Sequence, residues 1–383
     1  VEESSRWYPG GGLYRPVWLT LSADAHISDW GTFIRTTMVK GEGRKAVLTI
    51  SSHIEGLEHR RALASVEYAL FDADGHCVAR SEEALDAIGN CATELTLAKA
   101  RLWSPETPYL YTLRTRLTVD GRTMDETTNK VGVRTILVDG KGFHLNGKLR
   151  KFQGVCLHHD LGPLGAAVNR AALIRQIRIL KDMGCDAIRT AHNMPSTMQM
   201  EVCDSMGMMV MAESFDMWLY PKCKNGYALH FRDWAERDMT NLILCHRNHP
   251  SIVMWSIGNE IPEQWSVQGR QLSRWLQNIC HRLDPTRPVT QGMDKAEASL
   301  QSSFAQVMDV AGFNYRVHKF DQSISQLPQG VLLGSESAST VSSRGVYDIS
   351  CSSPREAKAV TSGGFPLEGQ CSSYDTDFCY WSN

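Results

Sequence analysis

Two glutamates stand directly at the ends of apolar runs, and their placement suggests paired carboxylate chemistry. Glu260 closes the run WSIGNE (255–260) and Glu336 closes LLGSE (332–336). A carboxyl group at the end of a buried strand has restricted access to water, and a neighbouring negative charge raises its pKa further. One carboxyl then stays protonated near neutrality while the other is ionised. Cleavage of a glycosidic bond requires such a pair, one as proton donor and one as nucleophile.

Other polar side chains follow apolar runs in the second half of the chain. If those runs are parallel strands of a barrel, their ends meet at one mouth, where active sites of that fold lie. We therefore expect a polar ring, rich in carboxylates and imidazoles, around the two glutamates. Its members are His158, His159, Asp160, His192, Asn193, Glu213, Asp216, Asn259, Asp294, Asn314 and Tyr315.

Several of these residues also admit a purely structural reading. His158 and His192 could be hydrogen-bonded core histidines as well as sugar contacts. His158, His159 and Asp160 resemble a metal site, but adjacent residues of an extended segment point to opposite sides, so we expect no shared ion. Trp218 could be a sugar-stacking platform, whereas we expect Trp255, in the middle of a strand, to lie in the barrel core.

The elements that must position these residues begin after Gly140, where strand-like and helical segments alternate. Such repeated units predict a parallel sheet, and the length of residues 135–383 fits a (β/α)₈ barrel of about 250 residues. We predict helices at Arg170–Met183 and Phe231–His246. We find no eighth strand, and the tail from Ser350 is typical of a long loop. The seven predicted strands are Lys151–Cys156, Ala187–Thr190, Met208–Glu213, Ile252–Asn259, Val289–Gly292, Val310–Asn314 and Val331–Gly334.

The first third of the chain has the pattern of antiparallel β structure. Short apolar runs alternate with turn signals such as Asp120-Gly121. About seven strands at this spacing predict a β-sandwich of immunoglobulin type, although the Cys…Trp…Cys pattern of true immunoglobulin domains is missing. The predicted strands are Val17–Leu21, Phe33–Val39, Ala46–Ser51, Ala64–Phe71, Glu94–Leu97, Tyr109–Val119 and Lys130–Thr135.

Composition excludes several classes of function. Hydrophobic residues make up 42% of the chain and charged residues 21%, as in globular proteins. The net charge of −2 offers no electrostatic footprint for nucleic acid or an acidic membrane, and no apolar run reaches the roughly 18 residues of a membrane span. The 11 cysteines are odd in number and form no C-x-x-C pair, so we expect reduced thiols.

Six segments together resemble glycoside hydrolase family 2, the family of β-galactosidases, β-glucuronidases and β-mannosidases. The most specific is RNHPSIVMWSIGNE (247–260), which resembles the acid/base signature of that family. The others are RWYPGGGLYRPVWL (6–19), LWSPETPYLYTL (102–113), VGVRTI (131–136), GVCLHHDLG (154–162) and IRTAHNMPS (188–196). The resemblance implies a jelly-roll remnant at 1–20, an immunoglobulin-like β-sandwich at 21–134, and an incomplete TIM barrel at 135–383 that lacks its last strand. It also implies that both ends of the chain are cut.

The same resemblance assigns roles to residues. It implies that Glu260 is the general acid/base and Glu336 the nucleophile. The implied mechanism is retaining, and it places the two carboxyls about 5–5.5 Å apart. The residues implied to bind substrate are Asn259 (at the sugar 2-hydroxyl), His158, His192, Tyr315 (near the nucleophile), Asn314 and Asp216.

Departures from the family pattern leave alternatives open. The family's eighth strand and most of its jelly roll are missing, and the position where some members carry a magnesium-binding glutamate is not Glu in AESFDMW (212–218). We therefore expect neither a metal nor a cofactor. We expect an exo-acting glycosidase that acts on a carbohydrate substrate, and a β-galactoside is the substrate that we expect first. A β-glucuronidase, a β-mannosidase or an inactive carbohydrate-binding fragment remain alternatives. The sequence leaves open whether the protein forms a homo-oligomer. It also leaves the compartment open, and both the bacterial periplasm and the cytoplasm are compatible with it.

Overall fold

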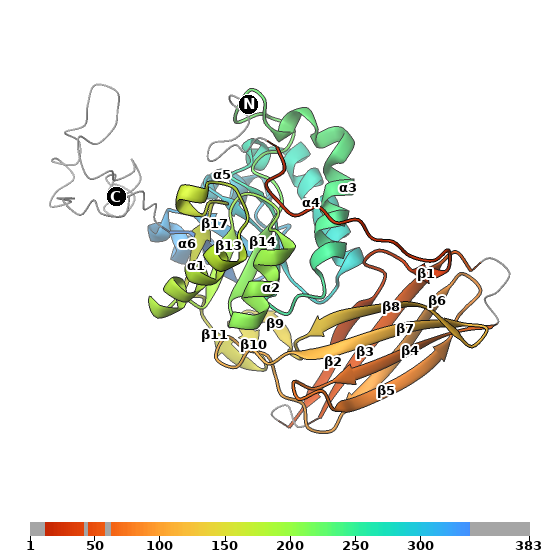
Figure 1. Cartoon of the computed structure of the whole chain (residues 1–383). Helices are drawn as coiled ribbons and strands as arrows, with labels where there is room; N and C mark the ends of the chain where they lie inside the picture. The colour runs from red at the N-terminus through yellow and green to blue at the C-terminus, as the bar shows by residue number, and fades with distance from the viewer. Residues whose placement is uncertain (1–11, 42–44, 58–62, 338–383) are drawn as a thin grey trace.

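The computed structural model describes residues 12–41, 45–57 and 63–337. Its first part consists of two antiparallel four-stranded sheets (Figure 1). In one sheet, β3 pairs with β1, β2 and β6; the other has the order β5-β4-β7-β8. The strands are β1 (His26–Ile27), β2 (Phe33–Lys40), β3 (Lys45–Glu55), β4 (Ala64–Phe71), β5 (Cys77–Ala84), β6 (Asn90–Leu97), β7 (Tyr111–Val119) and β8 (Arg122–Val131).

Strict alternation along the strands builds the core between these sheets. In β7 every second residue is buried, from Tyr111 to Val119, as expected for a strand with one face on a core. Leu48 and Ile50 of β3 and Leu113 and Leu117 of β7 belong to one buried cluster. This β-sandwich confirms the predicted fold class for the first part of the chain, whereas the domain boundaries stay a prediction.

Several strand predictions in this region were wrong. The predicted strand Lys130–Thr135 overlaps β8 only at Lys130 and Val131. Residues 12–23, here called the N-terminal segment, contain no strand, so the predicted strand Val17–Leu21 is incorrect. Its apolar side chains are 73–86% exposed at Val17, Trp18 and Leu19, because no sandwich strand pairs with them. Conversely, β5 was missed because it is an edge strand with few buried residues and a polar sequence. The part of the predicted jelly-roll remnant at residues 1–11 lies outside the described residues.

A three-stranded antiparallel sheet leads from the sandwich into an open barrel. It comprises β9 (Ile136–Asp139), β10 (Gly142–Leu145) and β11 (Lys148–Arg150). Seven parallel strands follow and pair in chain order, as predicted. They are β12 (Gly154–Leu157), β13 (Ala187–Thr190), β14 (Met209–Glu213), β15 (Ile252–Asn259), β16 (Val289–Met293), β17 (Ala311–Asn314) and β18 (Leu332–Glu336). The tail predicted as a loop from Ser350 lies outside the described residues.

Helices cover the outer face of these strands (Figure 1). Side-chain caps fix where several of them begin: Asn169 caps α1 and Ser196 caps α2, each accepting a backbone N–H. Gly207 ends α2 in the left-handed conformation, with φ +73°. The helices are α1 (Arg170–Asp182), α2 (Thr197–Met206), α3 (Phe231–His246), α4 (Val267–Leu283), α5 (Ala296–Gln301) and α6 (Phe320–Ile324). None of the helices in the described part combines the length and apolar character that a membrane span requires.

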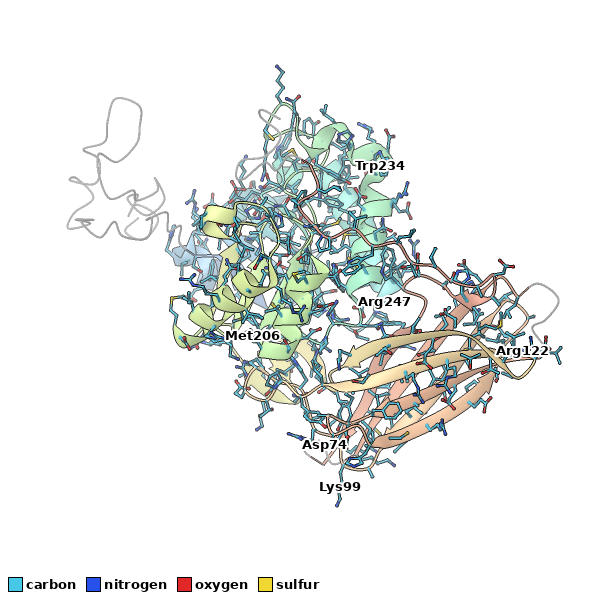
Figure 2. The ribbon with its side chains drawn as sticks, in the orientation of Figure 1. Asp74, Lys99, Arg122, Met206, Trp234 and Arg247 are labelled. Carbon is cyan, nitrogen blue, oxygen red and sulfur yellow. The ribbon has the colours of Figure 1, made fainter. Side chains whose placement is uncertain are left out.

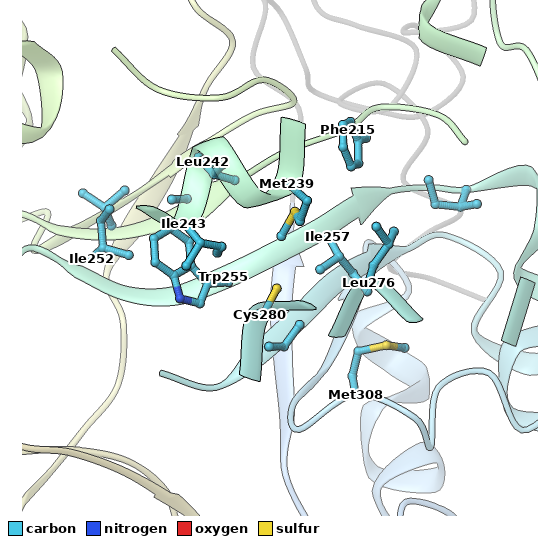
Figure 3. Close-up of a cluster of buried hydrophobic side chains, with 14 of the residues drawn as sticks. Phe215, Met239, Leu242, Ile243, Ile252, Trp255, Ile257, Leu276, Cys280 and Met308 are labelled. Atoms are coloured by element: carbon cyan, nitrogen blue, oxygen red, sulfur yellow. The ribbon is translucent and has the colours of Figure 1, made fainter. Parts of the chain in front are cut away.

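The central strand β15 is buried along its whole length. Its outward-facing Trp255 and Ile257 pack in one apolar cluster with Leu242 of α3 and Leu276 of α4 (Figure 3). Trp255 is therefore a core residue, as predicted, and its indole Nε1 donates to Asp284 at 2.9 Å. This packing fixes the strand that ends in Asn259 and Glu260.

The sandwich holds the other end of β15, through the segment Arg247–Pro250 that resembles the family signature. Asn248 Nδ2 donates to the Thr32 carbonyl at 2.8 Å, and its Oδ1 accepts from the Ile34 amide at 3.0 Å. Arg247, labelled in Figure 2 beside the sandwich, donates to the Trp30 carbonyl at 3.0 Å. These residues fasten the first part of the chain to the start of the central strand.

Candidate active site

A cavity of about 1330 Å³ runs along the interior of the open barrel, from the β9–β11 sheet at the amino ends of the parallel strands to their carboxyl ends. Its lining includes His158, Arg189, His192, Glu260 and Glu336, so both predicted glutamates border one space. The backbone turns sharply at this edge: Glu260 has φ +43° and Tyr315 has φ +57°. A left-handed conformation is unusual for residues other than glycine and is typical of functional sites.

Arg189, in the middle of β13, connects three strand ends through its guanidinium group. It forms an ion pair with Glu213, in which Nη2 lies 2.7 Å from Oε2. Its Nη1 donates to Glu336 Oε1 at 2.8 Å, and its Nη2 donates to Asn259 Oδ1 at 2.9 Å. Burial opposes its charge, yet Glu213 and Glu336 raise the pKa of Arg189 above its ordinary value. Arg189 is therefore a fixed cation beside the Glu336 carboxylate.

His192, which follows β13, lies between two carboxyl groups. Its Nδ1 shares a hydrogen bond with Glu213 Oε1 at 2.6 Å, and its Nε2 is 3.3 Å from Glu336 Oε1. Burial, together with the charge of Arg189, holds the pKa of His192 well below its ordinary value, so the imidazole is neutral. The His158 ring meets it edge-on, with ring centroids 4.9 Å apart.

Glu213 supports both of these groups from the fully buried end of β14. Ser256 Oγ donates to its Oε2 at 2.5 Å, beside the contacts with Arg189 and His192. Burial raises the pKa of Glu213, although Arg189 opposes the shift. The carboxyl group thus holds Arg189 and His192 in place from behind the cavity.

Glu260 and Glu336 are held by two consecutive residues, the last residue of β17 and the one that follows it. Asn314 Nδ2 donates to Glu260 Oε1 at 3.0 Å, and the Tyr315 hydroxyl donates to Glu336 Oε2 at 2.7 Å. Burial raises the pKa of Glu260, the Asn314 hydrogen bond opposes this, and the charges of Glu336 and Asp294 raise it further. One carboxyl is thereby biased towards its protonated form, while the other receives hydrogen bonds from Arg189 and Tyr315.

Asn259 and Asp216 form a second polar layer at the mouth. Asn259 Nδ2 donates to Asp216 Oδ1 at 3.0 Å, and its Oδ1 accepts from Asn314 Nδ2 at 3.0 Å. Lys222 Nζ donates to Asp216 Oδ1 at 3.0 Å and to the Asn259 carbonyl at 2.7 Å. A cation consequently lies within the same network as the carboxyl groups.

The structure brings most of the predicted site residues together. Hydrogen bonds, ring contacts or the cavity wall connect Glu260, Glu336, Asn259, His158, His192, Asn314, Tyr315 and Asp216. Their roles in binding or catalysis stay predictions.

Four members of the expected ring make their described contacts outside this cluster, although the charge of Asp294 still acts on Glu260. His159 packs against Tyr14, with ring centroids 5.6 Å apart. Asp160 accepts from the Gly162 amide, and Asp294 accepts from Gln264. The Asn193 amide donates to the Thr190 carbonyl at 3.3 Å. Trp218 is fully buried and donates to the Ile257 carbonyl, so it is no exposed stacking surface.

Arg189 and Lys222 were missed in the sequence. Arg189 carried a usable signal, because a charged residue within the four-residue buried strand Ala187–Thr190 requires buried partners. Lys222 carried none, since it lies in a loop without regular structure.

Two groups of residues in the described part have ligand atoms close enough for a metal ion, and one of them lies at this site. The ligand atoms of His158, His192 and Glu336 lie within 4.8 Å of one another. However, Glu336 already accepts from Arg189 on one oxygen and from Tyr315 on the other. A cation there would have to compete with the guanidinium charge, so the arrangement does not favour a metal.

Comparisons with known proteins match this architecture. Residues 25–134 match the model for glycosyl hydrolases family 2, and residues 136–328 match the TIM barrel domain of that family. A beta-galactosidase of Bacteroides ovatus is 36% identical, with 100% of this chain and 49% of that protein covered. A beta-glucuronidase of Sus scrofa is 30% identical over 73% of this chain and 41% of its own length.

Solved structures agree. A family 2 glycosyl hydrolase of Bacteroides cellulosilyticus superposes with a TM-score of 0.84 at 35% identity, covering 88% of this chain and 44% of that one. A beta-glycosidase of Bacteroides vulgatus gives 0.80 at 36% identity, covering 90% and 43%. The chain thus spans half or less of the length of these relatives. On these matches, the chain belongs to glycosyl hydrolases family 2.

Proposed function

We propose that this chain carries the catalytic centre of a retaining exo-glycosidase that removes a terminal β-linked galactose. The observation that carries the proposal is the unequal treatment of two carboxyl groups at one cavity. Glu260 is buried and its pKa is raised, whereas Glu336 is hydrogen-bonded by Arg189 and Tyr315. This asymmetry supports one proton donor and one ionised nucleophile.

In the first step, Glu336 Oε attacks the anomeric carbon. The bond from that carbon to the leaving oxygen breaks, and Glu260 gives its proton to that oxygen. A covalent glycosyl-enzyme forms, with the sugar linked to Glu336. Arg189 and Tyr315 donate to the two oxygens of Glu336 and hold its carboxyl group in one orientation before attack.

In the second step, water attacks the same carbon and Glu260 accepts its proton. The bond between sugar and Glu336 breaks, so the product keeps the β configuration. Asn259 is the proposed contact to the sugar 2-hydroxyl. Its Oδ1 already accepts from Arg189 and Asn314, so its orientation is fixed. His158 and His192 are proposed to contact the sugar from the side of β12 and β13.

The identity of the sugar is the most specific element of this proposal. The Bacteroides ovatus relative named a beta-galactosidase supports galactose. Relatives named beta-glucuronidases keep a glucuronide as the second candidate. A nitrophenyl β-galactoside, β-glucuronide and β-mannoside offered to the chain separately decide the point. The proposal expects the galactoside to have the highest kcat/KM, and it fails for galactose if the glucuronide is hydrolysed faster.

A non-catalytic carbohydrate-binding role is the second candidate function. The cavity extends from Glu260 and Glu336 along the barrel interior to the β9–β11 sheet, which leaves room for a glycan bound away from the two glutamates, without turnover. Calorimetric titration with galactose, run beside the turnover assay, separates the two roles. Binding without hydrolysis of any of the three glycosides favours the binding role and overturns the enzymatic one.

A further inference from the structure

The N-terminal segment, which precedes the sandwich in sequence, contacts the barrel beside the candidate site. In Figure 1 it is the red trace that passes the helices before reaching β1. Most of it is exposed, but Arg15 is half-buried. Its Tyr14 carbonyl accepts from the Val168 amide at 3.0 Å, just before α1. The segment is therefore attached to the barrel by more than apolar contact.

Arg15 binds the loop that carries His192. Its Nη2 donates to the Met194 carbonyl at 2.6 Å, and its Nη1 lies 3.3 Å from the Pro195 carbonyl. These two carbonyls belong to the short connection between the end of β13 and the Ser196 cap of α2. A charged donor on two successive carbonyls restricts the path of that connection, two residues after the imidazole.

Tyr14 contacts the loop that carries the other histidine. Its ring meets His159 edge-on, with ring centroids 5.6 Å apart at 73°. His159 has φ +58°, and its Nε2 is buried with no hydrogen-bond partner among the described residues. Ring packing by Tyr14 thus contributes directly to keeping His159 in this strained conformation. His159 directly follows His158, whose ring meets the His192 ring edge-on, so a shift of this loop would move the His158 ring as well.

We propose that Tyr14 and Arg15 are positioning residues that hold the loops of His158 and His192 against the cavity. The inference rests on the proposed glycosidase function for its effect on rate. It has a structural consequence that does not depend on activity. His192 Nε2 is 3.3 Å from Glu336 Oε1, so a shift of its loop alters the surroundings of the proposed nucleophile.

The test compares Arg15→Met, which keeps the length of the side chain but removes its donors, with Arg15→Lys, which restores one charged donor. We expect kcat on a nitrophenyl β-galactoside to fall roughly tenfold to hundredfold in Arg15→Met, as for a small misplacement of reacting groups. We expect Arg15→Lys to recover part of the loss. The acid limb of the pH profile of kcat/KM should move in Arg15→Met, because His192 borders Glu336.

Arg101→Met is the matched control. Arg15 lies over the Tyr14 ring, 5.4 Å from its centroid, and Arg101 lies over the Tyr109 ring in the same way, but beside the sandwich. The control should change neither kcat nor the pH profile. Equal kcat and an unchanged profile in Arg15→Met would overturn the inference, as would an equal effect of Arg101→Met. If Arg15→Met does not fold, Arg15→Lys and Tyr14→Leu carry the same comparison.

A second readout separates failure of this inference from failure of the proposed function. Ring-nitrogen NMR signals of His158 and His192, assigned with His→Gln variants, should shift in Arg15→Met and stay in place in Arg101→Met. A chain without turnover that still shows these shifts retains the positioning role and loses the proposed function. Unmoved signals in Arg15→Met reject the positioning role, whatever the turnover.

Discussion

The two ends of the central strand β15 both bury arginine, but they balance its charge differently. At the start, Arg134 donates to the Pro250 and Ile252 carbonyls at 2.5 and 2.8 Å, and Arg287 pairs with Asp284 at 2.5 Å. Main-chain carbonyls are prominent partners there. At the other end, a single guanidinium, Arg189, meets two carboxylates.

This difference separates a structural network from a reactive one. Carbonyl partners leave no titratable group facing open space, so the network at the start of β15 fastens the sandwich to the barrel. An excess of carboxyl groups around one cation leaves Glu260 and Glu336 at the cavity with different surroundings. Such a difference between neighbouring carboxyls is the pattern expected of acid and nucleophile.

The largest expected effect is at the reactive end. In Glu336→Gln, kcat should fall by about 10⁴-fold or more, because the residue proposed to form the covalent intermediate is lost. Steady-state assays with a nitrophenyl β-galactoside measure this loss. Glu236→Gln is the control, since Glu236 of α3 is exposed and its carboxylate pairs only with Arg282 of α4 among the described ion pairs. Substantial residual turnover in Glu336→Gln would remove Glu336 from the mechanism.

Glu260→Gln should lower kcat by roughly 10²–10⁴-fold, the range of general acid–base catalysis. The loss should be greatest for poor leaving groups, which depend on the proton. In the wild type, activity should decline on the alkaline side, because Glu260 must be protonated to donate and its pKa is raised by burial. A series of aryl galactosides measured across pH checks both points. A loss that is equal for all leaving groups would contradict the acid role.

At the structural end, Arg134→Met should lower the free energy of unfolding by about 1–3 kcal/mol, because the buried Pro250 carbonyl loses its donor. The Ile252 carbonyl keeps Arg287 as a donor at 2.7 Å. Urea unfolding measures the loss, and kcat of the folded variant should stay within a few-fold of wild type. A loss of kcat as large as that of Glu260→Gln would erase the distinction between the two ends of the strand.

The smallest expected effect concerns the pKa of Glu260. The charge of Asp294 raises the pKa of Glu260, so Asp294→Asn should lower that pKa. The alkaline decline of kcat/KM should then begin at a lower pH, with the maximal rate almost unchanged. A shift to higher pH in Asp294→Asn would show that another group governs this limb.

Much of the barrel was predictable because strand-like runs alternate with helical segments along the chain. Ala187–Thr190 and Ile252–Asn259 were predicted with the observed bounds, and both glutamates stood out as charges at the ends of such runs. Amino-acid composition gave wrong strand assignments where hydrogen-bonded pairing with another strand decides whether a segment is a strand. Val17–Leu21 is apolar yet has no partner strand, and the polar Cys77–Ala84 is a strand because β4 pairs with it.

The site residues that the sequence did not reveal have hydrogen-bond partners far away along the chain. Arg189 finds Glu213 at a separation of 24 residues and Glu336 at 147. No local pattern reveals such partners, because only closure of the parallel sheet brings them together. The same holds for Arg15, which meets Met194 across 179 residues.

Covalent trapping tests the central claim most directly. A 2-deoxy-2-fluoro-β-galactosyl fluoride should form the covalent intermediate faster than the intermediate is hydrolysed, because the 2-fluorine slows both steps while the good leaving group speeds the first. The account predicts that mass spectrometry of the digested chain finds one fluorosugar, attached to the peptide that contains Glu336. Turnover of galactosides with the label on another residue, or with no label at all, would contradict it.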